Sequence, residues 1–257
     1  MKKQIPNIFT LFNLFFGCVA IVYIMQNGID IVFTKEGEQF VKLKEDICLS
    51  SIFIGIAALV DFLDGFVARA LKVPSEMGKQ LDSLADVVSF GVAPGLILYQ
   101  FLRMGFIRES EGMEASVIWL FPAFIFSCAG AYRLARFNID TSQSYGFKGV
   151  PIPAAGLVVA ALPMIYWYNG DNETIYNLIL NKWFLYGVIL ILSWLMVSTL
   201  PMMAMKFKDY TIKNNLPKFL LLLIAVSAIV LSGWLAVPII FIAYIILSLI
   251  LKNKNTL

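Results

Sequence analysis

The sequence has 257 residues, of which 60% are hydrophobic and 14% charged, and its mean hydropathy is +0.80. This composition excludes an ordinary soluble domain and is typical of a polytopic membrane protein. The net charge of +3 does not indicate a nucleic-acid partner, and the three cysteines have no disulfide or metal-binding spacing.

Eight apolar segments are long enough to cross a bilayer, which predicts one all-α membrane domain over residues 1–257 with about eight spans. They cover residues 8–26, 47–70, 80–102, 116–138, 151–169, 183–205, 216–233 and 235–251. Met1-Lys2-Lys3 leads directly into the first segment without the cleavage site of a signal peptide. The loops at about 28–46, 103–115 and 170–182 are predicted to be solvated connections.

The charge distribution predicts the orientation of these spans. An even number of spans places both termini on one side, and 14 of the 20 Lys and Arg residues then fall on that side. By the positive-inside rule, both termini are expected to be cytoplasmic. The chain is thus predicted to lie in the inner or plasma membrane, with the turn near residues 72–78 facing the cytoplasm.

Four carboxylates interrupt the second and third apolar segments: Asp61, Asp64, Asp82 and Asp86. Charge within a membrane helix is costly and usually functional. The spacings of three and four residues put each pair on one helix face, and the Pro and Gly between the pairs predict a turn. We expect an antiparallel helical hairpin, with Asp64 and Asp82 at similar depth and Asp61 and Asp86 about one turn deeper. Converging carboxylates suit a hard divalent cation, Mg²⁺ or Mn²⁺.

Small and basic residues accompany these carboxylates. Gly65, Ala68 and Gly78 leave space for a ligand beside the helix backbone, and Arg69 offers a cation to a phosphate. The whole stretch, Asp-x2-Asp-Gly-x2-Ala-Arg-x8-Gly-x3-Asp-x3-Asp, resembles the signature of the CDP-alcohol phosphatidyltransferase family at all eight fixed positions.

Other segments extend the resemblance over most of the chain. Residues 5–13 are similar to the start of the first membrane helix of the family. Residues 89–94, 133–138 and 148–155 resemble the phosphatidylserine synthase branch. The resemblance implies a core of six helices over about residues 1–208, to which the spans at about 216–251 are an addition, and it implies a homodimer.

The resemblance also implies an activity. A member of this branch transfers the phosphatidyl group of CDP-diacylglycerol to L-serine and releases CMP. Membrane lipids would surround such an enzyme. Glycerol-3-phosphate and inositol phosphate are the alternative acceptors. An ion or proton transporter, and an intramembrane prenyltransferase with Asp-rich helices, are more remote alternatives.

Roles for individual residues follow from the resemblance and from the lack of histidine in the chain. The four aspartates would bind two divalent ions, and the nucleotide and phosphates would contact Asp61, Gly65, Ala68, Arg69 and Gly78. Any general base has to be a carboxylate or, less readily, a Lys, Tyr or Cys. Asp86 is the candidate, although neighbouring carboxylates and bound metals would affect its proton affinity in opposite directions.

Several polar residues are candidates for contacts with serine or the lipid phosphate: Asn7, Asn13, Ser89, Arg133 and Arg136. The two arginines could bind the carboxylate of serine or extend to lipid headgroups. Asn7, Thr10 and Asn13 recur every three residues along one helix face, where they could contact substrate or form interhelical hydrogen bonds.

Overall fold

A computed structural model describes residues 5–33, 39–71, 75–108, 116–140, 147–203 and 212–252. The described part is mainly α-helical. Its α-helices are α1 (Ile5–Gln26), α2 (Ile47–Leu71), α3 (Glu76–Asp86), α4 (Ala93–Ile107), α5 (Ala123–Ile139), α6 (Ile152–Ala160), α7 (Leu162–Tyr168), α8 (Glu173–Ile179), α9 (Lys182–Val197), α10 (Ile212–Ser232) and α11 (Ala236–Lys252). A π-helix, η2 (Val87–Val92), joins α3 to α4, and 3₁₀ turns occur at η4 (Val117–Leu120) and η5 (Gly233–Leu235).

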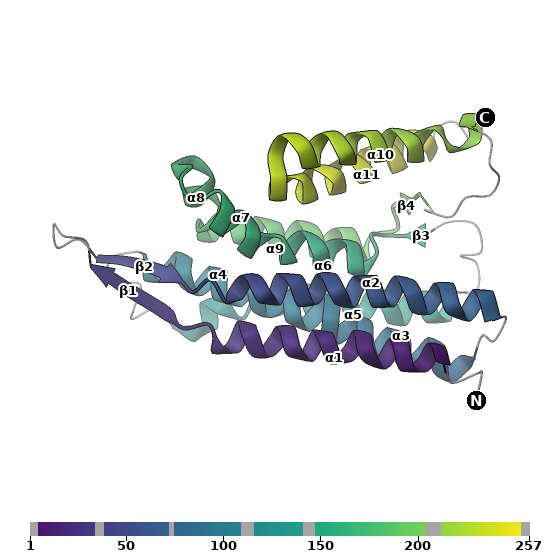
Figure 1. The fold of residues 1–257 in the computed structure, drawn as a ribbon, viewed down its shortest axis with the longest axis horizontal. Helices are drawn as coiled ribbons and strands as arrows, with labels where there is room; N and C mark the ends of the chain where they lie inside the picture. The colour runs from purple at the N-terminus through teal and green to yellow at the C-terminus, as the bar shows by residue number, and fades with distance from the viewer. Residues whose placement is uncertain are drawn as a thin grey trace.

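The long helices lie side by side in layers (Figure 1). Helices α1 to α5 form one side of the bundle, α6, α7 and α9 lie on them, and α10 and α11 form the outermost layer. The beginning of α1, the beginning of α3 and the end of α11 lie at the same end of the bundle. The cytoplasmic location of both termini stays a prediction.

Four helical stretches in the described residues are long and apolar enough to cross a membrane: Pro6–Gln26, Ile47–Val67, Glu76–Ile107 and Asn215–Ile250. A fifth is possible if α8 and α9, which meet at a bend of 62°, count as one broken span. The Asn215–Ile250 stretch contains both α10 and α11, with Gly233 between them at a φ of +54°. The chain therefore has at least four membrane-capable segments, and the count of eight stays a prediction.

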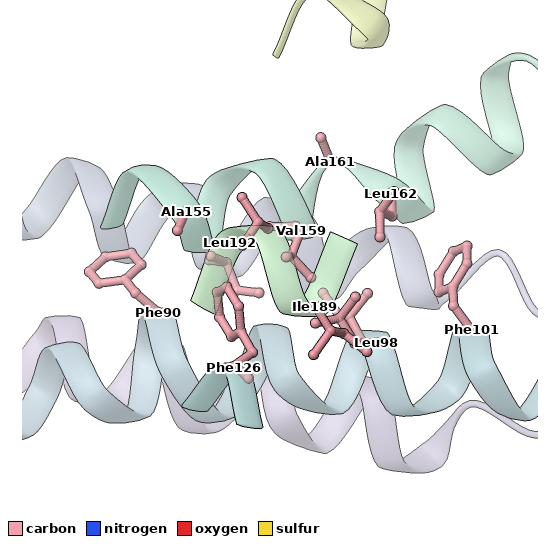
Figure 2. Packing of buried hydrophobic residues seen from close by; sticks show 14 of the residues in the cluster. Phe90, Leu98, Phe101, Phe126, Ala155, Val159, Ala161, Leu162, Ile189 and Leu192 are labelled. Atoms are coloured by element: carbon pink, nitrogen blue, oxygen red, sulfur yellow. The ribbon is translucent and has the colours of Figure 1, made fainter. Parts of the chain in front are cut away.

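The buried core lies where α4, α5, α6 and α9 meet. Phe90 and Leu98 extend from one continuous helix towards Phe126 of α5, Ala155 and Val159 of α6, and Ile189 and Leu192 of α9, as Figure 2 shows. Gly130 of α5 allows the beginning of α6 to approach closely, because a Cβ there would overlap the side chain of Ile152. The close packing fixes the position of the third apolar segment, which carries two of the four aspartates.

The boundaries differ from the sequence prediction in several places. The span expected over 151–169 is divided at Ala161 into α6 and α7, and the loop expected at about 170–182 contains helix α8. The loop expected at about 28–46 contains an antiparallel ladder of β1 (Ile29–Phe33) with β2 (Gln39–Leu43). The helix expected over 183–205 ends at Val197, where the Ser198 hydroxyl donates to the carbonyl of Leu195. Pro201 and Met202 then form β4, which pairs with β3 (Phe147–Lys148). Residues 198–203 are apolar enough to extend the predicted span, although they do not continue the helix.

Candidate active site

Three carboxylates meet between α2 and α3. One oxygen from each of Asp61, Asp64 and Asp82 lies within 4.8 Å of the others, a grouping that could bind a metal ion. Asp64 is buried, and Asp61 and Asp82 are half-buried. All the donor atoms are carboxylate oxygens, the ligands that Mg²⁺ and Mn²⁺ prefer. The residues therefore fit a hard divalent cation.

Asp86 lies beside this group but is not part of it. Its carboxylate is buried and is close enough to interact electrostatically with Asp61, Asp82 and Asp64. The structure thus brings the four predicted carboxylates into one region, with three positioned around a common point and Asp86 next to them.

Helix α1 supports the carboxylates of both α2 and α3. The Thr10 hydroxyl lies 2.8 Å from Asp64 Oδ2 and 3.2 Å from the Pro6 carbonyl oxygen, so it can donate to either. The Asn13 amide donates to Asp86 Oδ1 at 3.3 Å. Asn13 is three residues further along α1 than Thr10, about 4.5 Å along the helix axis, so the two hydrogen bonds start from different levels of α1. Thr10 and Asn13 thus form interhelical hydrogen bonds, one of the two alternatives that the sequence left open.

A second layer of contacts holds Asn13 itself. The Ser89 hydroxyl donates to the backbone carbonyl of Asn13 at 3.0 Å, and both residues are fully buried. Gly17, one turn along α1, packs directly on Ser89, because a Cβ at this position would lie 2.9 Å from Ser89 Cα and would overlap its hydroxyl. Oδ1 of Asn13 is buried with no hydrogen-bond partner among the described residues. Ser89 therefore positions Asn13, and an acceptor atom remains unused beside Asp86.

The π-helix begins directly after Asp86. The N–H of Ala93 bonds to the carbonyl of Val88, five residues earlier, and Pro94 has no N–H to donate to Phe90. The Ser127 hydroxyl of α5 donates to the carbonyl of Gly91 at 2.8 Å. Such single-turn π segments are frequent at functional sites. Here the segment determines the rotation of Asp82 and Asp86 relative to the rest of the helix.

Gly78 serves close packing between α1 and α3. A Cβ at this position would lie 3.0 Å from Oδ1 of the buried Asn7 and 2.9 Å from the hydroxyl of Ser75. Ser75 caps α3 by accepting the N–H of Gly78 at 2.9 Å. Gly65 is half-buried directly after Asp64. Ala68 and Arg69 belong to α2, and their side chains lie outside the described part of the structure.

The two candidate arginines of α5 differ in their surroundings. Arg136 donates from both terminal nitrogens to the carbonyls of Val197 and Ser198, at 2.6 and 2.8 Å, and so caps the end of α9. Arg133 is only 6% exposed, stacks on Phe137 at 5.3 Å, and its Nε has no hydrogen-bond partner among the described residues. Asp86 acts on it electrostatically. Of these two arginines, Arg133 therefore has an N–H group that can still donate a hydrogen bond to a ligand near the carboxylates.

The other branch-like segment, residues 148–155, lies against the end of α9. Gly149 has a φ of +77°, a conformation that favours glycine, and its N–H bonds to the carbonyl of Leu200 at 2.8 Å. The Val150 N–H bonds to the carbonyl of Leu195 at 3.1 Å. Lys148 forms an ion pair with Asp140 at 2.9 Å. These contacts are structural, and they fix the position at which α6 begins.

Gly17 and Ser127 were not singled out from the sequence. Gly17 carries a weak signal, an isolated glycine within an apolar helix, which often marks close packing. Ser127 has none, because a serine within a membrane helix is too common to indicate one particular carbonyl.

Residues 3–197 of the chain match the family described as CDP-alcohol phosphatidyltransferase. This match covers most of the sequence and includes all four carboxylates. The chain belongs to the CDP-alcohol phosphatidyltransferase family. With this membership and several membrane-capable helices, it is an integral membrane protein.

Members of the family with curated names are similar over much of the chain. A protein of Helicobacter pylori strain J99 named CDP-diacylglycerol–serine O-phosphatidyltransferase is 36% identical over 232 residues, which are 87% of this chain and 80% of that protein. Proteins of the same name are 37% identical over 115 residues in Bacillus subtilis strain 168 and 42% over 106 residues in Methanocaldococcus jannaschii. These two matches cover 45% and 41% of this chain, and 60% and 46% of the relatives.

Proposed function

We propose that this protein transfers the phosphatidyl group of CDP-diacylglycerol to the hydroxyl of L-serine, which forms phosphatidylserine and CMP. The observation that carries the proposal is the grouping of Asp61, Asp64 and Asp82 in the family signature, with Asp86 held beside it. The names of the relatives support serine as the acceptor.

The proposed reaction is a single displacement at phosphorus. The serine hydroxyl oxygen forms a bond to the phosphorus that carries diacylglycerol, while the bond from that phosphorus to the bridging oxygen of CMP breaks. The electron pair of the broken bond leaves with CMP, and the hydroxyl proton goes to a base, for which Asp86 is our candidate. Asn13 would orient the Asp86 carboxylate by its hydrogen bond to Oδ1.

Asp61, Asp64 and Asp82, with Asp86 as a further ligand, would hold two divalent cations. When bound, these ions would neutralise the diphosphate and stabilise CMP as the leaving group. Thr10 would keep one oxygen of Asp64 oriented. Gly65, Ala68, Arg69 and Gly78 are the proposed nucleotide and phosphate contacts, although Gly78 also permits the approach of Asn7.

Arg133 is our candidate for the carboxylate of serine. A buried guanidinium needs hydrogen-bond acceptors, and its Nε has none among the described side chains and backbone groups. A carboxylate can accept two parallel bonds from such a group. Arg136, by contrast, already donates to two carbonyls of the α9 end. Asn7 and Ser89 remain weaker candidates for substrate contacts, because each already packs against protein groups.

The proposal includes an orientation and an assembly. The aspartates would face the cytoplasm, where serine is available, and the lipid would enter sideways from the bilayer. The whole chain would act as one membrane domain, in which α10 and α11, beyond the matched residues, are an addition to the family core. We further propose that it forms a homodimer.

A membrane assay with labelled CDP-diacylglycerol tests the proposal. Serine, glycerol-3-phosphate, inositol and inositol phosphate are offered in parallel, and we expect phosphatidylserine to form fastest. Faster formation of another lipid would overturn serine as the acceptor but leave the transfer chemistry intact. The absence of CMP release with every acceptor, together with ion flux in liposomes, would instead support the transporter alternative.

The stereochemistry at phosphorus tests the single displacement. No histidine is present to form a phosphatidyl-enzyme intermediate. We therefore expect inversion of configuration with a chiral phosphorothioate substrate. Retention of configuration, or exchange of CMP into CDP-diacylglycerol without serine, would show a double displacement.

A further inference from the structure

A polar cavity lies at the other end of the bundle from the aspartates. Its volume is about 300 Å³, and it is lined by Gly105, Arg108, Asn177, Leu180, Asn181, Lys182 and Trp183. The residues come from the end of α4 and from the corner between α8 and α9. Ligand pockets in proteins begin at about this size, so the cavity suits a small polar group.

The cavity is far from the catalytic carboxylates. Asp86 and Gly105 are 19 positions apart in one continuous helical segment, Glu76–Ile107, which places them roughly 28 Å apart along its axis. This length is close to the thickness of the hydrocarbon core of a bilayer. Whichever side the aspartates face, the cavity therefore opens near the opposite surface of the membrane and cannot be part of the transferase site.

Two cations line the cavity, and the structure fixes both near aromatic rings. Arg108 donates to Oδ1 of Asn177 at 2.9 Å, and its guanidinium lies 5.0 Å from the ring of Tyr176. The Lys182 ammonium lies 4.9 Å from the ring of Phe106. Among the described residues that line the cavity, no carboxylate is present. The lining therefore favours an anion.

The walls of the cavity are built by close backbone contacts. A Cβ on Gly105 would lie 2.7 Å from the carbonyl oxygen of Leu180, so glycine allows α4 to approach the α8–α9 corner. The Asn181 side chain accepts the N–H groups of Trp183 and Phe184 and so fixes the beginning of α9. The two cations therefore come from different elements, Arg108 from the end of α4 and Lys182 from the beginning of α9.

Aromatic side chains place the cavity at the depth of lipid headgroups. Trp183 is 72% exposed, and its ring lies 6.0 Å from that of Tyr186. The Tyr186 hydroxyl donates to the carbonyl of Trp119, which is also exposed, at 2.6 Å. Exposed Trp and Tyr residues concentrate at the boundary between hydrocarbon and water. An anion in the cavity would therefore lie at the level of lipid phosphates.

We propose that this cavity binds a phosphate group, held between Arg108 and Lys182. A phosphate has the oxygen acceptors to match a guanidinium fork and an ammonium point charge at once. It could belong to the headgroup of an anionic lipid or to a soluble phosphate compound. The bound phosphate would connect α4 to the α8–α9 corner and stabilise the end of the bundle remote from catalysis.

Thermal unfolding of the purified full-length protein in detergent tests the proposal, because a ligand of the folded state raises its stability. One arm titrates micelles that contain phosphatidylglycerol against micelles that contain only phosphatidylcholine. The other arm titrates inorganic phosphate against chloride at equal ionic strength. Each is repeated with the double variant Arg108→Gln/Lys182→Gln. The matched control is Arg103→Gln, since Arg103 is an exposed cation of the same helix that does not line the cavity.

We expect at least one phosphate probe to raise the unfolding temperature, with an apparent affinity about tenfold weaker or more in the double variant and nearly unchanged in Arg103→Gln. A response to phosphatidylglycerol alone would identify a lipid headgroup, and a response to inorganic phosphate would identify a soluble source. No response to either probe, or an equal response in the double variant, would overturn the proposal. If the double variant does not fold, Lys182→Gln alone serves, and CMP release provides the check of folding.

Discussion

The side-chain amide of Asn13 donates a hydrogen bond to Oδ1 of Asp86 at 3.3 Å, and this bond links α1 to the end of α3. Both residues are buried, so water does not compete for the contact. The bond leaves the second oxygen of Asp86 available for a proton or a metal. The orientation of the proposed base is thus determined by a residue 73 positions away in the sequence.

Replacement of Asn13 by alanine is expected to lower kcat about 10- to 100-fold, because partners that orient functional carboxylates commonly have effects of this size. CMP release from CDP-diacylglycerol measures the loss. Asn27→Ala is the matched control, since Asn27 follows directly after the far end of α1 and its side chain hydrogen-bonds the backbone of Lys44, away from the carboxylates. An equal loss in both variants would show that Asn13 acts through the stability of α1 alone.

Asp86→Asn is expected to lose most of its turnover but to retain binding of CDP-diacylglycerol. The substitution removes the proton acceptor while it keeps the size of the side chain, so kcat should fall more than KM for the lipid rises. Steady-state kinetics and direct binding of the lipid separate the two effects. If affinity for the lipid and for divalent cation is lost together, Asp86 is mainly a metal ligand and the base lies elsewhere.

Removal of divalent cations is expected to abolish turnover reversibly. The group of Asp61, Asp64 and Asp82 offers only carboxylate oxygens, which hold a bound diphosphate poorly unless cations lie between them. Excess chelator should stop CMP release, and added Mg²⁺ or Mn²⁺ should restore it. Full activity in chelator would contradict the metal proposal.

Each of Asp61→Asn, Asp64→Asn and Asp82→Asn should be inactive yet folded, and should show weakened binding of Mn²⁺ by electron paramagnetic resonance. Asp30→Asn is the matched control, because Asp30 is exposed and pairs only loosely with Lys44, at 3.7 Å. Its activity and Mn²⁺ binding should be unchanged. Retained Mn²⁺ binding in all three test variants would place the metal site elsewhere.

Gly17→Ala is expected to destabilise the protein by about 1–3 kcal/mol, because the new methyl group would overlap Ser89 and overpack the contact between α1 and η2. Thermal unfolding in detergent measures the change. Gly55→Ala is the matched control, since a Cβ at Gly55 meets nothing within 4 Å. That variant should be neutral or more stable by up to about 1 kcal/mol, from helix propensity. Equal stability of the two variants would argue against close packing at Gly17.

The aspartate site could be predicted well because its information is local. Spacings of three and four residues determine the shared helix face of each pair, and the turn between the pairs determines their relative depth. Contacts between distant segments could not be predicted in this way. Asn13 could contact substrate or form an interhelical hydrogen bond, and its position among polar residues neither distinguished these possibilities nor indicated Asp86 as its partner.

The fold shows the same limit. Apolar length indicated the membrane-capable segments, but hydropathy has no information on backbone hydrogen bonds. It therefore missed the π-helix at Val87–Val92, which is followed by Pro94, a residue without an N–H, and accepts a hydrogen bond at Gly91 from Ser127 of α5. It also extended the sixth segment beyond Val197, although the following residues pair as a strand with Phe147–Lys148.

The two arginines of α5 give the sharpest test of the acceptor site, because they lie one turn apart on one helix and have different surroundings. Arg133→Lys is expected to raise KM for serine about tenfold or more and to leave affinity for CDP-diacylglycerol nearly unchanged, since lysine cannot form a bidentate pair with a carboxylate. Arg136→Lys should lower the unfolding temperature, because it loses the bonds to the carbonyls of Val197 and Ser198, but should keep KM for serine within about twofold. Initial rates at varied serine, together with thermal unfolding, separate the two effects. The reverse assignment, with serine affinity lost in Arg136→Lys and kept in Arg133→Lys, would place the acceptor on the other side of α5.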